Sequence, residues 1–366
     1  MRTEIIPVDL IRIIPAEEAM KYFNSIVAGT MMLASITGCK KADNQADTVS
    51  NERQKEVVVY TYDSFAAEWG AAPILAEKFK EKTGLTVTFV DCGDAAQALS
   101  KAILEKDNPN ADVLMGPDNN LAEKARASGV LVPYKPTGAD TIIAKEQEDS
   151  LGGDWLLTPY DYSHFALIYD TSSKVPAPGS LEDLTRPEYK RNLILMDPRT
   201  STPGLGFVAW TVARFGDSYA DYWKALKPSI LTMAPGWTAG YGAFTNGEAP
   251  LVISYTTSPA YHYEEDKSTR FKALVFAEGH VQQTEGAGII KGAKNEVGAK
   301  MFLDFLISKD AQNALPLTQW MYPVNNDAEI PESYKIAAPI PGTTLSVSST
   351  SLKDAVETVM NILSEK

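Results

Sequence analysis

The sequence contains little that could build a disulfide framework or a metal site. Its 366 residues include two cysteines, Cys39 and Cys92, and three histidines, His164, His262 and His280. The histidines do not have the spacing of zinc ligands, so we expect neither a metal site nor a cofactor. If Cys39 is used as a lipid attachment point, as argued below, Cys92 has no partner. The fold is then expected to form without an intrachain disulfide, even in an oxidising compartment.

The chain also lacks an excess of positive charge and a long apolar run. Its net charge of −13 argues against nucleic acid and anionic lipid as partners, and it is compatible with a cationic small ligand. With 44% apolar and 22% charged residues, the composition is that of a soluble globular protein large enough for two domains. We find no internal repeats, and the polar stretch 40–55 is the one low-complexity segment.

The N-terminal part has the pattern of an export signal. Lys21 precedes the mostly apolar stretch 23–36, which is shorter than the roughly 20 apolar residues that a spanning helix needs. The small residues that follow, up to Cys39, resemble a bacterial lipoprotein box. We therefore predict a signal and lipoprotein segment over 1–39, lipidation at Cys39 and a flexible tether over 40–55. The protein is expected in the periplasm or cell envelope, with membrane contact through the N-terminal lipid only.

The residues after the tether alternate between strand and helix patterns. Strands are predicted over 57–62, 85–90 and 111–115, with helices over 67–82 and 95–104 between them. This alternation is the signature of a parallel sheet with helices on its faces.

A second unit of the same α/β kind follows. Short apolar strands over 165–169 and 193–196 alternate with a predicted helix over 205–215. We therefore expect two lobes, the first formed by 56–160 with 262–366 and the second by 161–261.

Three segments have the character of ligand-binding edges. The segment 254–262 follows the buried strand 251–253 and contains two tyrosines, several hydroxyl side chains and a proline. The segments 60–65 and 197–204 have a similar composition. Open α/β sheets place their sites at the carboxyl ends of strands, so we expect these edges to converge on one cleft.

Motifs in these segments give the chain a specific resemblance. The matching stretches are 59–70 (VYTYDSFAAEWG), 118–121, 197–206, 236–237, 254–261 and 320–323. In these stretches the sequence resembles the periplasmic thiamine-binding proteins of bacterial thiamine ABC transporters, and the resemblance extends over most of the chain after the tether. It implies an α/β, two-lobed type II periplasmic-binding-protein fold with a ligand cleft between the lobes. It also implies a non-enzymatic receptor that captures thiamine, or thiamine phosphates, and delivers it to an ABC permease.

The resemblance also implies the residues of the binding site. The ligand contacts of the family correspond to Asp94, Ala95, Ser201, Thr202, Trp237, Tyr255, Thr256, Thr257, Ser258 and Pro259, and the aromatic walls to Tyr62, Trp69, Tyr261 and Trp320. Ala95 stands where the family often has glycine, which puts a close backbone contact in doubt at that position.

The chemistry of thiamine is consistent with these residue types. Its thiazolium ring is a permanent cation, and each electron-rich aromatic face attracts a cation by about 0.5–2 kcal/mol. A carboxylate such as that of Asp94 accepts a hydrogen bond from the aminopyrimidine. Ser201 and Thr202 precede a predicted helix, whose N-terminus suits an alcohol or phosphate tail. Trp155, Trp210 and Trp223 lie outside the motifs and are expected in the core.

Two other functions remain open from the sequence. Thiamine-degrading enzymes share the overall fold and use a cysteine nucleophile, and Cys92 lies two residues before Asp94. Ferric-ion receptors of the same fold use paired tyrosines, for which Tyr255 and Tyr261 are candidates. The carboxylate and histidine that would accompany them are not evident nearby.

Overall fold

The structure is a computed structural model that describes residues 55–347 and 349–365. These residues belong to one compact unit, Thr48–Lys366. The predicted signal segment 1–39, its lipidation site Cys39 and almost all of the tether 40–55 lie outside the described residues. Within the part that the structure describes, no helix has both the length and the apolar character needed to cross a bilayer.

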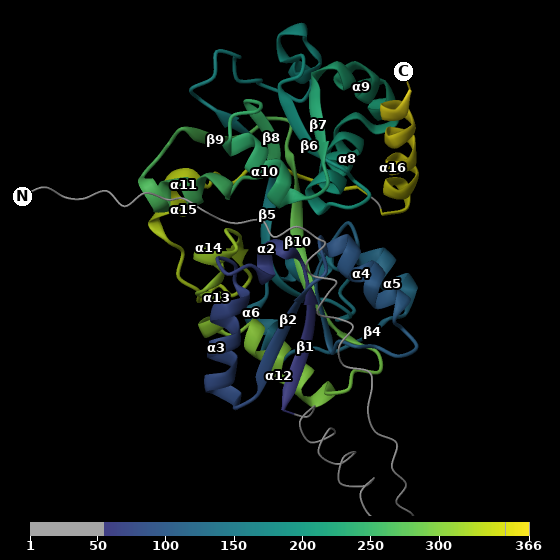
Figure 1. The fold of residues 1–366 in the computed structure, drawn as a ribbon, viewed down its shortest axis with the longest axis vertical. Helices are drawn as coiled ribbons and strands as arrows, with labels where there is room; N and C mark the ends of the chain where they lie inside the picture. The colour runs from purple at the N-terminus through teal and green to yellow at the C-terminus, as the bar shows by residue number, and fades with distance from the viewer. Residues whose placement is uncertain (1–54, 348, 366) are drawn as a thin grey trace, which may run out of the picture. The chain divides into compact units, whose positions relative to one another are not determined.

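A mixed β-sheet forms the centre of the fold (Figure 1). Its main path runs in the order β2 (Thr86–Asp91), β1 (Glu56–Thr61), β3 (Val113–Asp118), β10 (His280–Ile290), β5 (Thr158–Asp170), β8 (Leu251–Tyr255), β6 (Leu193–Met196) and β7 (Ile230–Ala234). Short strands extend it, with β4 (Leu131–Val132) and β12 (Thr344–Leu345) beside β10, and β9 (Phe271–Leu274) and β11 (Tyr322–Pro323) beside β5.

Helices cover the sheet, and the C-terminal helix α16 (Ser349–Ser364) packs against α8 (Thr202–Phe215) and α9 (Tyr219–Leu226) (Figure 1). The helices are α2 (Asp63–Ala66), α3 (Ala72–Thr83), α4 (Ala95–Leu104), α5 (Ala122–Ser128), α6 (Ala139–Ile142), α7 (Lys145–Ser150), α8 (Thr202–Phe215), α9 (Tyr219–Leu226), α10 (Trp237–Thr245), α11 (Ser258–Asp266), α12 (Glu296–Leu306), α13 (Lys309–Gln312), α14 (Leu315–Thr318), α15 (Glu332–Ala337) and α16 (Ser349–Ser364). Short 3₁₀ turns are η2 (Glu182–Thr185), η3 (Pro187–Tyr189), η4 (Gly216–Ser218) and η5 (Lys227–Ser229).

Local sequence signals explain where the first helices begin and end. Asp94 and Gln97 form a reciprocal capping box at the start of α4, which coincides with the predicted helix 95–104. Gly84 ends α3 in the left-handed conformation with φ 75°. The predicted helix 67–82 corresponds to α3, which begins later, at Ala72, and the separate short helix α2 ends at Ala66, before the predicted range. A Cβ atom on Gly70 would lie 2.2 Å from the Ser64 carbonyl oxygen, so the chain turns tightly between them.

The parallel sheet that the alternation predicts is present on both sides of the centre. Strand β1 pairs in parallel with β2 and β3, and β6 pairs in parallel with β7 and β8. At the centre, outside the strands that this alternation covers, β10 runs antiparallel to both β3 and β5. The sequence of β10, HVQQTEGAGII, has no hydrophobic alternation in its first half, and it was therefore not predicted as a strand.

Strand β5 connects the two halves of the sheet. Its first half, through His164, pairs with β10, and its second half, from Phe165, pairs with β8 and β9. The lobe boundary predicted near residue 160 falls within this strand. The division into lobes at 56–160 with 262–366 and at 161–261 remains a prediction.

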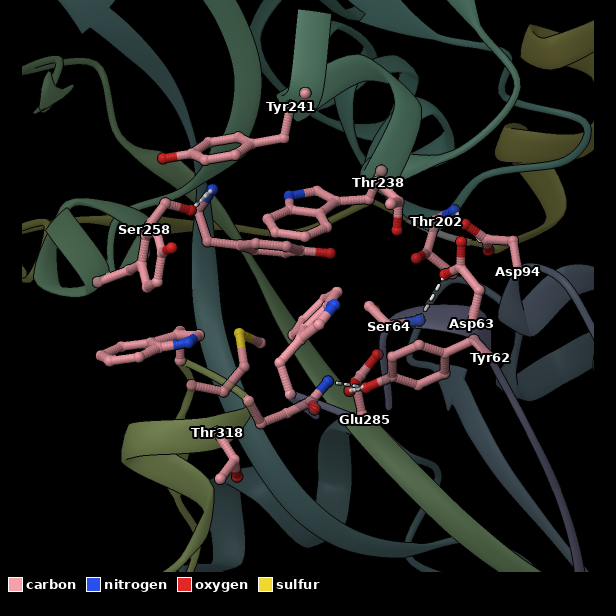
Figure 2. Close-up of a pocket in the computed structure, with 18 of the residues that line it drawn as sticks. Tyr62, Asp63, Ser64, Asp94, Thr202, Thr238, Tyr241, Ser258, Glu285 and Thr318 are labelled. Carbon is pink, nitrogen blue, oxygen red and sulfur yellow. Dashed lines mark hydrogen bonds between the residues drawn. The ribbon is translucent and has the colours of Figure 1, made fainter. Parts of the chain in front are cut away.

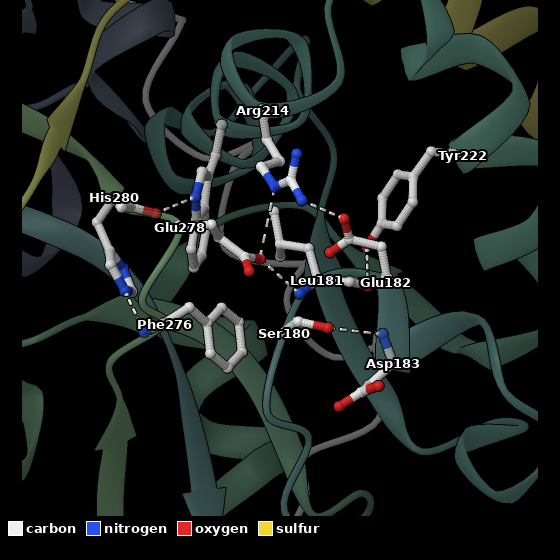
Figure 3. Close-up of polar contacts among 11 residues, drawn as sticks. Ser180, Leu181, Glu182, Asp183, Arg214, Tyr222, Phe276, Glu278 and His280 are labelled. Atoms are coloured by element: carbon white, nitrogen blue, oxygen red, sulfur yellow. Dashed lines mark hydrogen bonds and ion pairs between the residues drawn. The ribbon is translucent and has the colours of Figure 1, made fainter.

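A polar cluster joins helix α8 to the loops around it (Figure 3). Arg214 lies between Glu182 and Glu278, and Glu278 also accepts a hydrogen bond from the backbone N–H of Leu181 at 2.9 Å. The indole N–H of the buried Trp210 donates to the carbonyl of Gly279 at 3.0 Å.

The three tryptophans outside the motifs differ in burial. Trp210 and Trp223 are buried in the core, as predicted. Trp155 is only partly buried and has a left-handed backbone, with φ 59°. The prediction that it belongs to the core is therefore only partly correct.

Candidate functional site

A cavity of about 480 Å³ is lined by residues from several separate elements (Figure 2). This volume lies in the range that suits a small organic ligand. Figure 2 shows Tyr241 on one side of the cavity and Glu285 and Thr318 on the other. The residues lining it are Tyr62, Asp63, Ser64, Trp69, Asp94, Thr202, Trp237, Thr238, Tyr241, Gly242, Thr245, Tyr255, Ser258, Tyr261, Glu265, Gln283, Glu285, Leu317, Thr318, Gln319, Trp320 and Met321.

A stacked pair of rings from helix α10 forms one wall. Trp237 and Tyr241 lie one helical turn apart, and their ring centroids are 4.9 Å apart with an interplanar angle of 15°. The indole N–H of Trp237 donates to the Ser254 hydroxyl at 2.8 Å, and the Tyr241 hydroxyl lies 3.0 Å from His262 Nε2. Each of the two rings is therefore held by a polar contact at its edge, so the stack is in place before any ligand enters.

A second aromatic group lies nearer the solvent. Tyr261 and Trp320 meet edge to face, with centroids 5.3 Å apart. Trp69 is 54% exposed and Tyr261 is 42% exposed. Trp320 has a left-handed backbone with φ 57°, which is uncommon for a bulky residue. These rings offer apolar surface where the cavity opens.

Glu285 is the most buried acid of the pocket wall. Its carboxylate accepts hydrogen bonds from the hydroxyls of Tyr62 at 2.7 Å and Tyr160 at 2.9 Å, and from the Gln283 amide at 2.9 Å. The amide of Gln319 donates in turn to the Tyr62 hydroxyl. Burial outweighs these donors and raises the pKa of Glu285 to about 7.

Asp94 links two helix starts on another side of the pocket. Besides capping α4, its carboxylate accepts a hydrogen bond from the Thr202 backbone N–H, at 3.1 Å, in the first turn of α8. Burial raises the pKa of Asp94 to about 7, although these backbone donors oppose the shift. Asp63 and Glu265 add further carboxyl groups, and no Lys, Arg or His is among the residues that line this pocket of the described chain.

The structure brings most of the predicted site residues to one cavity. Those lining it are Tyr62, Trp69, Asp94, Thr202, Trp237, Tyr255, Ser258, Tyr261 and Trp320. Their distribution along the chain agrees with the expected convergence of separate edges.

The remaining predicted residues are buried beside the cavity and do not line it. Ala95 is in the first turn of α4, and Pro259 is in the first turn of α11. The hydroxyls of Thr256 and Thr257 turn toward Ser163, at 3.3 and 3.1 Å. These four side chains support the wall from behind.

Ser201 also lies behind the wall, although it is adjacent to Thr202. It is 1% exposed, and its hydroxyl has no hydrogen-bond partner in the structure. Its backbone carbonyl accepts the first hydrogen bond of α8, from Leu205. The predicted contact of its side chain with a ligand is not supported by this position.

Sequence reasoning missed several lining residues. Tyr241 follows Trp237 by four residues on α10, and this helical spacing could have identified it. Gln283 and Glu285 lie on β10, which lacks a strand pattern, so their sequence carried no signal. Gln319 and Met321 flank Trp320 and could have been included with it.

The two alternative functions depend on Cys92 and on Tyr255, and the surroundings of these two residues bear on each function. Cys92 does not line the cavity, and its thiol lies 3.4 Å from the Val90 carbonyl. Burial raises its pKa, whereas a nucleophile needs a lowered one. Tyr255 donates to Gln283 at 2.9 Å, and no cluster of three or more His, Cys, Asp or Glu residues able to hold a metal occurs in the described part of the chain.

Replacing Asp94 with asparagine tests whether this carboxylate binds ligand or only caps helices. We expect the Asp94→Asn protein to keep its melting temperature within a few degrees, because asparagine is an equally good N-cap. Binding of a cationic ligand should weaken roughly tenfold, since hydrogen bonds to charged groups contribute about 1.5–3 kcal/mol. Calorimetric titration measures the affinity. Unchanged binding would assign Asp94 a structural role.

Curated relatives resemble most of the chain. The "Thiamine-binding periplasmic protein" of Brucella melitensis is 39% identical over 296 residues, which cover 80% of this chain and 86% of the relative. The protein of the same name from Escherichia coli is 38% identical over 273 residues, covering 74% of this chain and 81% of the relative.

Solved structures give the same result for the fold. A periplasmic thiamin binding protein superposes with a TM-score of 0.78 at 35% identity, covering 85% of this chain and 96% of that structure. A ferric binding protein from Campylobacter jejuni, at 19% identity and a TM-score of 0.67, shares the fold alone. The model of the bacterial extracellular solute-binding protein family matches residues 75–341. This chain is therefore a member of the bacterial extracellular solute-binding protein family and has its two-lobed α/β type II fold.

Proposed function

We propose that this solute-binding protein captures thiamine in the cavity lined by Trp237 and Glu285 and delivers it to an ABC permease. The observation that carries the proposal is the composition of the wall, which combines stacked aromatic faces with several carboxyl groups and has no basic side chain. Thiamine is a flat aromatic cation, and this wall matches both its shape and its charge.

The relatives support the same ligand. Proteins 38–39% identical to this chain over most of its length carry the name thiamine-binding periplasmic protein. The cavity also contains the three tryptophans and the tyrosines that the motif resemblance assigned to the ligand. Thiamine phosphates are a second candidate ligand, although the wall has no basic side chain to pair with a phosphate.

Neither alternative function gains support from the cavity. A thiamine-degrading enzyme needs an activated nucleophile at the ligand, and the Cys92 thiol has a raised pKa and does not line the cavity. A ferric-ion receptor needs anionic tyrosines, and burial raises the pKa of Tyr255 well above its ordinary value.

A titration of tryptophan fluorescence tests the proposed ligand. Thiamine should saturate the signal at one site, and its neutral oxidised form, thiochrome, should bind at least tenfold more weakly because it lacks the cationic ring. Thiamine monophosphate and diphosphate are titrated alongside. Mass spectrometry after incubation should recover intact thiamine. Equal binding of thiochrome, or no binding of thiamine, would contradict the proposal.

The family places the protein in the periplasm, and we propose that a lipid on Cys39 tethers it there. The Cys39→Ser protein should remain unprocessed or become freely soluble, because the lipid attaches through the cysteine sulfur. Phase partitioning in detergent after expression in a bacterial host measures the tethering. A correctly cleaved Cys39→Ser protein that still partitions into detergent would contradict the proposal.

A further inference from the structure

Three buried carboxyl groups lie side by side across the central strands. Glu285 on β10 is the direct cross-strand neighbour of Asp118 on β3 and of Asp161 on β5. Asp118 and Asp161 are fully buried, and Glu285 is 4% exposed. We call these three residues the carboxyl row. Like charges that face each other across strands destabilise a sheet, so the row requires an explanation.

The hydrogen-bond donors around the row are unevenly distributed. Asp118 accepts from the backbone N–H groups of Asn120 and Leu121, at 3.0 and 3.1 Å, and Glu285 accepts from two tyrosine hydroxyls and an amide. Neither carboxyl oxygen of Asp161 accepts a hydrogen bond from an N–H group or a hydroxyl, and its one side-chain partner is the acid Glu285. A carboxyl group without donors is far more stable neutral than charged in a buried position. Asp161 is therefore the member of the row that holds a proton most firmly.

The groups that face the row add no positive charge. Tyr62 and Tyr160 contact Glu285 directly, and their phenols stay neutral because burial and nearby acids raise their pKa values. Asp94 also interacts unfavourably with Glu285 and raises its pKa further. Tyr255 and Tyr334 also face the row, and burial raises the pKa of both phenols well above the ordinary value, so they stay neutral. Gln283, Gln319 and Asn120 are uncharged amides. A cation inside the cavity would therefore be the first positive charge to approach the row.

We propose that Glu285 is the specificity-determining residue for a cationic ligand and that it exchanges a proton for that ligand. The proposal rests on the proposed function in one respect, namely that the ligand is a cation. Glu285 is the member of the row that lines the cavity. As the cation enters, the Glu285 carboxyl group loses its proton to the solvent and becomes a carboxylate. The net charge of the site is thus unchanged, and Asp161 keeps its own proton.

The sign of the pH dependence follows from this exchange. The pKa of Glu285 in the free protein is about 7, and the bound cation lowers it. Binding therefore releases a proton between the lowered pKa of Glu285 in the complex and its pKa in the free protein. Over that range the affinity rises with pH, until about pH 8, where the group is ionised in both states. At pH 7 Glu285 should contribute roughly half a proton to the release per ligand bound.

Calorimetric titration of the full chain with thiamine, in buffers of different ionisation enthalpy, counts the released protons. Asp94 also lines the cavity and has a pKa of about 7, so it contributes protons of its own. We therefore expect Glu285→Gln to release about half a proton fewer per thiamine than the unmodified protein, and its affinity should fall about tenfold or more. The matched control is Glu77→Gln, which removes an exposed carboxylate of α3 outside the cavity and should change the affinity less than twofold. Asp161→Asn should also bind within about twofold, since it replaces a neutral group with a neutral isostere.

Several results would overturn the inference without affecting the proposed function. These are thiamine binding with no proton release, an affinity independent of pH between about 5.5 and 8.5, or a large loss of affinity in Asp161→Asn. A Glu285→Gln protein that loses thiochrome binding as strongly as thiamine binding would show a packing role instead.

A second measurement tests the row even if thiamine does not bind. Infrared spectroscopy of the ligand-free protein at neutral pH should show the carbonyl band of a buried protonated carboxyl group, and Asp161→Asn should lose part of it. Absence of that band in the unmodified protein would overturn the inference. If the band is present but the protein does not bind thiamine, the proposed ligand is refuted, whereas the inferred protonation of the row still holds.

Discussion

Replacing Trp237 with alanine is expected to weaken thiamine binding by about 1–3 kcal/mol, which is roughly a 5- to 150-fold rise in Kd. The loss combines the attraction between the indole face and the cation with the apolar contact of the ring. Trp237 is partly buried, and its other contacts are the stack on Tyr241 and the hydrogen bond to Ser254. Calorimetric titration with thiamine measures the effect.

Two control variants separate stacking from a general disturbance of the pocket. Trp237→Phe keeps an aromatic face and should recover much of the lost affinity. Trp69→Ala removes an exposed ring at the mouth of the cavity and should have a smaller effect than Trp237→Ala. If Trp237→Ala binds thiamine normally and remains folded, Trp237 does not contact the ligand.

Replacing Gly204 with alanine is expected to lower the free energy of unfolding by about 2–3 kcal/mol. Gly204 lies in the first turn of α8, and a Cβ atom there would lie 2.4 Å from the carbonyl oxygen of Met196 at the end of β6. Backbone atoms cannot move aside as a flexible side chain can, so the helix and the strand must separate. Thermal or urea unfolding measures the loss of stability. The separation of α8 from β6 also displaces Thr202 from the cavity.

Gly242→Ala is the matched control for this prediction. Gly242 is also helical, in α10, but a Cβ atom there would have no neighbour within 4 Å. Alanine has the higher helix propensity, so this variant should be neutral or more stable by up to about 1 kcal/mol. Equal stability of the two variants would contradict the steric account of Gly204.

The sequence predicts those elements whose signal is local. Helix α4 and strand β6 coincide with the predicted ranges, because the apolar spacing and the capping residue are read from a few neighbouring positions. Strand β10 could not be predicted. Its buried positions include Thr284 and Glu285, whose burial depends on neighbours far away in sequence.

The same distinction applies to the site. Aromatic residues in motifs, such as Trp237 and Tyr255, were found because the motifs themselves are specific. Glu285 was not found, because its position beside Asp118 and Asp161 results from the register of three strands rather than from any spacing along the chain. Thr256 and Thr257 were placed at the ligand, since sequence does not show toward which side a hydroxyl in a turn points.

The left-handed backbone of Trp320 has a consequence for the kinetics of capture. A φ of 57° costs a bulky residue roughly 1–2 kcal/mol, and this cost is met when the chain folds rather than when a ligand arrives. The ring is therefore already in position against Tyr261 in the empty receptor. A ligand meets a surface that needs little rearrangement, so the association rate is set mainly by diffusional encounter. Differences among ligands are then expressed as differences in residence time.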